Sequence, residues 1–192
     1  PVITSVLRGE VTTALAMETR LLPPDLLVVG GCKTVGKSSN QGLAEELAQA
    51  LPCAVLAVRP SAQNLSIALE TNRRLRLFVA LDRSRASDTL VAFVMMLRRG
   101  MPCDLVLSYL YWPPMEHERL GIPPGKDPMA ADAQVTAVLE GEIRRRFENI
   151  GGTGELTVAC APHAASTRVD LMNAAHNAKA DIVLLGAHRR DA

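Results

Sequence analysis

The residues best suited to chemistry lie in one glycine-rich segment near the N-terminus. It reads Gly31-Cys32-Lys33-Thr34-Val35-Gly36-Lys37-Ser38 and matches the pattern G-x-x-x-x-G-K-[ST]. In such a loop the backbone N–H groups surround phosphate oxygens, the lysine adds a positive charge and the hydroxyl binds Mg²⁺. An apolar run predicted as a strand precedes the segment, and a predicted helix follows it. We therefore expect a phosphate-binding loop made by Gly30, Gly31, Gly36, Lys37 and Ser38.

Two further strand ends carry residues that could bind a ligand. The apolar run 75–81 ends at Asp82, and the run 181–185 ends at Gly186, two positions before His188. Ligands of open parallel sheets bind beyond the carboxyl ends of the strands, where a carboxylate can bind adenosine or a divalent ion. A second interpretation stays open, in which Asp82 and Ser84 cap the helix that begins at Arg85.

The cysteines and histidines predict no metal or catalytic centre. Three of the four cysteines, Cys53, Cys103 and Cys160, lie in or beside apolar runs, where a cysteine is usually a small buried side chain. Cys32 lies in the glycine-rich loop, where a thiol could be reactive. The four histidines have no partner at the spacing of a triad or a zinc site. We interpret His188 as a solvated loop residue or a ligand-loop residue.

Composition excludes several classes of partner. Of 192 residues, 48% are hydrophobic and 21% are charged, so the chain can bury a core. The net charge is only +1 and aromatics make up 3%, which argues against nucleic acid and anionic membranes as partners. No apolar run reaches the length of a membrane span. We expect a cytoplasmic protein.

A repeat organises the chain. Pro24-Asp25-Leu26-Leu27-Val28-Val29-Gly30 recurs 156 positions later as Ala180-Asp181-Ile182-Val183-Leu184-Leu185-Gly186. Both copies have the pattern of a parallel strand buried on both faces. Further strands are predicted at 2–7, 53–58, 75–81, 105–110 and 156–160, and helices at 10–22, from 42 to 51, 86–99, 132–148 and 167–179. Residues 60–74 are predicted to be a polar linker, and the proline-rich segment 112–128 an irregular loop.

Alternating strands and helices predict two α/β units with parallel sheets. The first unit, residues 1–60, has only the second half of the pattern, and residues 61–74 link it to a second unit, 75–192, that lacks a last helix and strand. The chain therefore looks like part of a longer protein. We predict the strand order 3-2-1-4 in the second unit and a separate partial sheet in residues 2–58.

These runs resemble one known family in their order and spacing. Leu75-Arg76-Leu77-Phe78-Val79-Ala80-Leu81-Asp82-Arg83-Ser84 resembles the first strand of a universal stress protein domain, which ends in Asp-x-Ser. Ala180–His188 is similar to that family's fourth strand and the start of its nucleotide loop, and 46–59 to its closing helix and fifth strand. The resemblance implies tandem, incomplete domains of a Rossmann-like, adenine nucleotide alpha hydrolase-like fold, usually dimeric. It also implies ATP or AMP as ligand, with Mg²⁺ accompanying ATP.

The sequence departs from the family's ligand loop in both units. Arg189 and Lys33 stand where the second glycine of Gly-x-x-Gly belongs, and Gln41-Gly42 falls about two residues before the place of the later Gly-Ser. The resemblance therefore implies a stress-response module that is non-catalytic and has at most a degenerate nucleotide site. A P-loop NTPase is the alternative, with Asp82 as the carboxylate that ends a neighbouring strand. A purely structural dimerisation domain is a third hypothesis.

The same pattern predicts association. A partial sheet that ends at 53–58 leaves an unpaired strand edge, and such edges bind other strands. We expect a homo-oligomer, most simply a dimer, or a contact between the two half-domains, with 53–58 in the contact.

Overall fold

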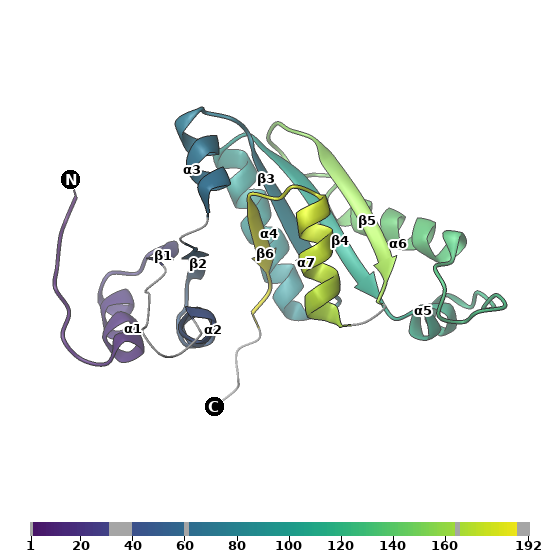
Figure 1. The fold of residues 1–192 in the computed structure, drawn as a ribbon, viewed down its shortest axis with the longest axis horizontal. Helices are drawn as coiled ribbons and strands as arrows, with labels where there is room; N and C mark the ends of the chain where they lie inside the picture. Colours follow the sequence, from purple (N-terminus) through teal and green to yellow (C-terminus); the bar gives the residue numbers. More distant parts are fainter. Residues whose placement is uncertain (1, 31–39, 60–61, 164–165, 188–192) are drawn as a thin grey trace. The chain divides into compact units, whose positions relative to one another are not determined.

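The computed structural model describes residues 2–30, 40–59, 62–163 and 166–187. The chain divides into two compact units, unit 1 with Pro1–Gln63 and Ala187–Ala192, and unit 2 with Asn64–Gly186 (Figure 1). Unit 1 holds α1 (Val11–Leu21), β1 (Leu26–Gly30), α2 (Asn40–Ala50) and β2 (Ala54–Val58). α3 (Gln63–Glu70) begins at the boundary, and unit 2 continues with β3 (Leu75–Leu81), α4 (Arg85–Gly100), β4 (Cys103–Tyr111), α5 (Pro113–Leu120), α6 (Ala133–Arg146), β5 (Leu156–Pro162), α7 (Thr167–Asn177) and β6 (Ile182–Leu185). None of the helices in the described ranges is long and apolar enough to cross a membrane.

Unit 1 is built on a two-stranded parallel sheet. β1 pairs with β2 from Leu26 opposite Ala54 to Gly30 opposite Val58. Leu47 of α2 is fully buried and Leu51, directly after the helix, is nearly so, as their i, i+4 spacing predicts. Glu10 caps α1 because its carboxylate accepts hydrogen bonds from the backbone N–H groups of Thr12 and Thr13. The separate partial sheet is thus confirmed.

The prediction of a strand at residues 2–7 is wrong. These residues have no regular secondary structure, and Val2, Ile3 and Val6 are almost fully exposed. Unit 1 was expected to hold only the second half of a domain, so this segment would be the third strand of that domain. In the order 3-2-1-4 a third strand pairs with the second strand. The described part of unit 1 contains no such strand, so the backbone of this segment has no ladder to join.

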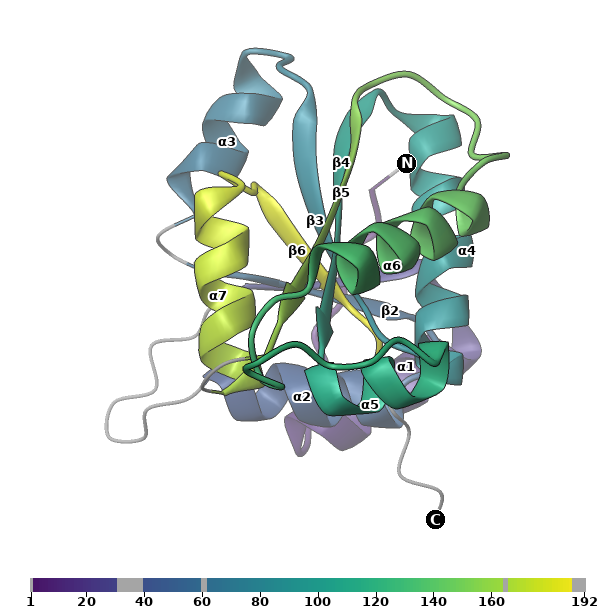
Figure 2. The same ribbon diagram turned by 90° about the vertical axis from the view of Figure 1, so that its right-hand side faces the viewer.

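Unit 2 is an open parallel sheet with the order β5-β4-β3-β6. β3 pairs with β4 from Leu75 opposite Cys103 and, on its other side, with β6 from Leu77 opposite Ile182. This is the Rossmann-like α/β architecture, and the predicted strand order 3-2-1-4 is confirmed. α4 and α6 cover one face of the sheet and α7 lies on the other (Figure 2).

The main core of unit 2 lies between the sheet and the helices α4 and α6. It contains apolar side chains from β3, β4 and β5 that alternate with residues on the opposite face. Buried members include Leu75, Leu77, Val79, Leu90, Val94, Leu105, Leu107, Ile143, Phe147 and Val158. The apolar residues of these parallel strands therefore fill the face of the sheet that α4 and α6 cover.

Two helices were missed by the sequence prediction. α3 forms inside the predicted linker because Ala68 is fully buried in the core of unit 2, with Leu65 packed beside it. α5 forms inside the proline-rich segment, where we expected irregular structure. Its two prolines occupy the first helical positions, which need no N–H donor, and Gly121 ends the helix with a φ of 65°.

The repeated strands are less buried than predicted. Leu26 and Val28 of β1 are 39% and 56% exposed, and Val183 and Leu185 of β6 are 43% and 60% exposed. Only every second residue of each strand packs inward. One face of each repeated strand is therefore open, whereas strands buried on both faces were expected.

Candidate functional site

Asp82 forms a compact turn at the end of β3. Its Oδ1 accepts hydrogen bonds from the Ser84 backbone N–H at 2.8 Å, the Ser84 hydroxyl at 2.5 Å and the Ser87 hydroxyl at 2.6 Å. The Ser87 hydroxyl in turn accepts a hydrogen bond from the Asp82 backbone N–H at 2.8 Å. Ser84 is the N-cap of α4, which agrees with the second interpretation of the sequence, and its hydroxyl accepts a hydrogen bond from the Ser87 N–H. The sequence Asp-x-Ser thus anchors the first turn of α4 to the end of the strand.

Gly186 brings the end of β6 against the same helix. A Cβ built on Gly186 would lie 3.0 Å from the carbonyl carbon and the Cβ of Ala86. A side chain there would force β6 and the first turn of α4 apart, so glycine permits the close approach. Because β6 is the neighbour of β3, Asp82 and Gly186 end adjacent strands.

This edge is the point where the strand order reverses. β3 leads through α4 to β4 on one side, and β6 lies on its other side. Ligands of open α/β sheets bind in the crevice at such a point, beyond the carboxyl ends of the strands. The position of the two predicted residues therefore fits a binding edge, while the hydrogen bonds of the Asp82 carboxylate to Ser84 and Ser87 serve the fold.

The remaining predicted residues divide between unit 1 and the undescribed segments. Gly30 ends β1 in unit 1, pairs with Val58, and has open space where a Cβ would lie. Packing therefore does not require glycine at this position. The other predicted residues, Gly31, Gly36, Lys37, Ser38 and His188, lie outside the described residues, as does Cys32. Gly30 belongs to a different sheet from Asp82 and Gly186.

A buried carboxylate beside this edge was missed by the sequence analysis. Glu116 of α5 has a side chain only 6% exposed. Its Oε1 accepts a hydrogen bond from the Tyr109 hydroxyl at 2.8 Å, and its Oε2 accepts from Arg83 at 3.0 Å and Arg119 at 2.6 Å. A buried carboxylate needs such partners, because an unpaired charge in a protein interior is strongly unfavourable.

The ion pairs extend from Glu116 to α6. Arg119 donates two parallel hydrogen bonds of 2.9 Å to Glu142, and Arg83 approaches the same carboxylate at 3.4 Å. The bidentate bond to Glu142 raises the pKa of Arg119, and burial raises the pKa of Tyr109. We call Arg83, Tyr109, Glu116, Arg119 and Glu142 the Glu116 network. It joins the end of β3 to β4, α5 and α6.

The network has a consequence for ligand binding. Its two guanidinium groups are matched by two carboxylates, so it offers no surplus positive charge to a phosphate. Glu116 and Arg119 have the i, i+3 spacing of a helical ion pair. That spacing could have revealed the network from the sequence, had a helix been expected in the proline-rich segment.

A pair formed by a histidine and an aspartate also lies at this end of the sheet. His163 follows β5, and its Nδ1 is 2.9 Å from Oδ2 of Asp170 in α7. The sequence pattern did not indicate this pair, because the fold joins residues on two different elements. The Trp112 ring, 44% exposed, lies 6.2 Å from the His163 ring between centroids.

Two of the cysteines have environments that suppress reactivity. Cys103 is fully buried, and burial raises the pKa of its thiol. Burial also raises the pKa of Cys160 to about 12, with smaller contributions from Glu140, Glu116 and Glu142. Both thiols are therefore protonated at neutral pH and unreactive as nucleophiles. Within the described residues, no group of three potential metal ligands comes together.

Comparisons with known proteins give little more. No protein-family model matches the chain, and no curated protein matches it. Among solved structures, the crystal structure of protein Rv1636 from Mycobacterium tuberculosis H37Rv is similar over 58% of this chain and 70% of that chain, with 18% sequence identity and a TM-score of 0.38. Neither a family nor an activity follows from a match at this level.

Proposed function

We propose that the chain is a non-catalytic, universal stress protein-like module with a degenerate adenine nucleotide site. The observation that carries this proposal is the pair of strand ends at the reversal point of unit 2. Asp82 and Gly186 end the neighbouring strands β3 and β6, and Gly186 lies against the first turn of α4. An adenosine between these ends would find a carboxylate on one side and the helix N-terminus on the other.

Several features favour weak binding and argue against turnover. Arg83, the cation nearest Asp82 in the chain, is engaged with Glu116 and Glu142. Arg189 replaces a glycine that would leave room for backbone N–H groups to reach a phosphate. A hydrolase would also need a group that positions water and a cation that stabilises the transition state. Such groups increase the rate of hydrolysis by about 10³–10⁵-fold.

The P-loop NTPase is the second candidate, favoured by one observation. β1 ends directly before the Gly31–Ser38 motif and α2 begins at Asn40, which is the strand, loop and helix order that the motif requires. Against it, the carboxylate that should end a neighbouring strand is Asp82, and β3 belongs to a different sheet from β1. The stress-protein proposal therefore has the better support.

The test is a calorimetric titration of ATP and AMP, together with a phosphate-release assay. Asp82→Asn and Lys37→Ala are the informative variants, and Asp88→Asn and Lys126→Ala are their matched controls. We expect weak binding that Asp82→Asn reduces further, with no phosphate release. Magnesium-dependent turnover abolished by Lys37→Ala would establish the NTPase instead. Absence of binding in the unmodified chain would leave only a structural module.

A further inference from the structure

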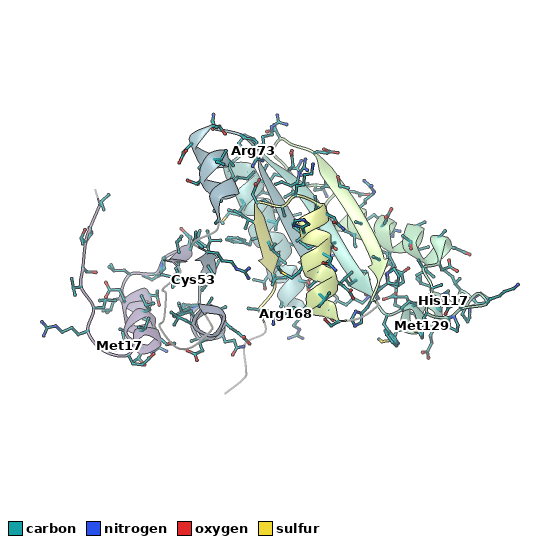
Figure 3. The ribbon with its side chains drawn as sticks, viewed as in Figure 1. Met17, Cys53, Arg73, His117, Met129 and Arg168 are labelled. Atoms are coloured by element: carbon teal, nitrogen blue, oxygen red, sulfur yellow. The ribbon has the colours of Figure 1, made fainter. Side chains whose placement is uncertain are left out.

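A cavity lies at the amino end of the sheet of unit 2, opposite the strand ends at Asp82 and Gly186. It has a volume of about 320 Å³ and is formed by the amino ends of β3, β4 and β5 together with the C-terminal end of α7. Figure 3 labels Arg73 close to this end and Arg168 at the opposite end of α7. The cavity is therefore separate from the strand ends at Asp82 and Gly186. Its polar lining residues are Arg76, Asp104, Glu155, Thr157, Asn177 and Lys179.

The cavity carries charges of both signs in fixed places. Arg76 is held in the wall, because its Nη1 donates a hydrogen bond to the Ala178 carbonyl at 3.3 Å. Asp104 is held as well, because its Oδ1 accepts from the Glu155 backbone N–H at 3.0 Å. The other carboxylate oxygen forms an ion pair with Nη2 of Arg76 at 3.9 Å, a distance too long for a hydrogen bond. Both groups therefore keep capacity for a ligand.

Lys179 occupies a backbone position that favours glycine. Its φ is 52°, and it directly follows the C-cap of α7. The N–H of Ala180 donates to the Ala175 carbonyl, the bond that closes such a helix end. A lysine in this conformation is less stable than glycine. The Lys179 side chain is exposed and forms no ion pair within the described residues, so its ammonium group is available to a ligand.

We propose that this cavity binds a small zwitterion, a molecule of the α-amino acid class that carries one ammonium and one carboxylate. Arg76 and Lys179 bind the carboxylate, and Asp104 and Glu155 bind the ammonium. A pocket of this volume is at the lower end of the roughly 300–1,000 Å³ typical of small-molecule sites. The inference is independent of the proposed nucleotide site.

The charge balance distinguishes a zwitterion from other ligands. Two cations and two carboxylates line the cavity, so a ligand of a single sign meets repulsion from half of them. The C-terminal carbonyls of α7 lie at the same wall, and this negative end of the helix dipole favours an ammonium and disfavours a phosphate. Nucleotides and simple anions are therefore poor candidates for this cavity.

The experiment compares three related probes on the full chain, which differ in the charged groups that they carry. These are 2-aminobutyrate, butyrate, which lacks the ammonium, and propylamine, which lacks the carboxylate. Binding is followed by amide chemical shifts in ¹H–¹⁵N NMR spectra. We expect saturable shifts with 2-aminobutyrate at Arg76, Asp104, Glu155 and Asn177–Lys179, and binding of each single-charge analogue about tenfold weaker or more.

The variants separate binding from folding. Lys179→Gly removes the ammonium and relieves the backbone, so we expect an unchanged or higher thermal midpoint with about tenfold weaker binding of 2-aminobutyrate. Asn72→Gly is the matched control, because Asn72 has a φ of 50° and does not line the cavity. Asp104→Asn should also weaken binding. Equal binding of butyrate, full affinity in Lys179→Gly, shifts confined to the Asp82 end or no saturable shifts with 2-aminobutyrate would each overturn the proposal.

Discussion

Glu116 connects the chain segments that meet near the carboxyl ends of the strands in unit 2. Its buried carboxylate is the shared acceptor for the Tyr109 hydroxyl and two guanidinium groups from separate segments of the chain. A buried acceptor of this kind stabilises mainly because its removal leaves charges without partners. The network is therefore better regarded as a support for the strand ends than as catalytic machinery.

The first prediction concerns this carboxylate. Glu116→Gln keeps the size of the side chain and removes its charge, so Arg83 and Arg119 lose their buried counter-charge. We expect the free energy of unfolding in urea to fall by about 2–3 kcal/mol. Glu142→Gln is the control, because the Glu142 side chain is 35% exposed and its removal should cost less than about 1 kcal/mol. Equal losses in the two variants would contradict the central place of Glu116.

The second prediction concerns Gly152, which lies in the turn between α6 and β5. Its φ is 93°, and a Cβ there would lie 2.1 Å from the Arg98 carbonyl oxygen. Gly152→Ala should therefore lower the free energy of unfolding by about 2–4 kcal/mol. Gly141→Ala is the matched control, since Gly141 lies inside α6 and the added methyl meets only the far end of Arg145 at 3.8 Å. That variant should gain about 0.5–1 kcal/mol. If Gly152→Ala leaves the free energy of unfolding unchanged, the turn can shift to make room for the methyl group.

At the scale of elements, α1 gives a prediction about pH. Backbone hydrogen bonds from Thr12 and Thr13 lower the pKa of Glu10 from 4.5 to about 2. A carboxylate whose pKa is lower in the folded state stabilises the fold above its unfolded pKa. That contribution is lost as the pH falls through the folded value. We expect the α1 amides to lose hydrogen-exchange protection as the pH falls from about 4.5 to about 2, and Glu10→Gln to remove this dependence. A Glu10 carboxyl that titrates near 4.5 by ¹³C NMR would contradict the cap.

The elements also show what a single sequence can reveal. β3, β4, β5, α4 and α6 were predicted because each carries a continuous or periodic apolar pattern that fills one core. α3 and α5 were missed because their stability comes from tertiary burial and from prolines placed at a helix start, which local polarity hides. The strand at 2–7 was predicted from its apolar residues alone, although a strand needs a partner.

The candidate site was predictable only where it is local in sequence. Asp82, Ser84 and the start of α4 lie within a few residues, so the cap could be expected from the pattern. The Glu116 network and the pair of His163 with Asp170 join different elements, and only the fold brings them together. Apart from the i, i+3 spacing of Glu116 and Arg119 within α5, nothing in the spacing of these residues along the chain indicates their contacts.

At the scale of the whole molecule, the two copies of the repeated strand belong to sheets of different size. β6 joins a four-stranded sheet, whereas its counterpart β1 pairs with β2 alone among the described residues. In both units the strand that ends in glycine keeps one open apolar face. Unit 1 thus has the smaller sheet and, in β2, a strand whose second edge has no partner in the described part of the chain.

The last prediction concerns that edge. A strand with an unpaired row of N–H and C=O groups binds other strands, and natural proteins prevent this with edge charges. β2 reads Ala54-Val55-Leu56-Ala57-Val58 and contains no charge. We therefore expect the chain to form a homodimer through β2, visible as a concentration-dependent species in sedimentation velocity. Ala57→Lys places a charge on an exposed position of β2 and should shift the equilibrium to monomer, whereas Ala50→Lys, on an exposed position of α2, should leave it unchanged. A protein that stays monomeric at all concentrations, or a dimer indifferent to Ala57→Lys, would show that this edge is not the interface.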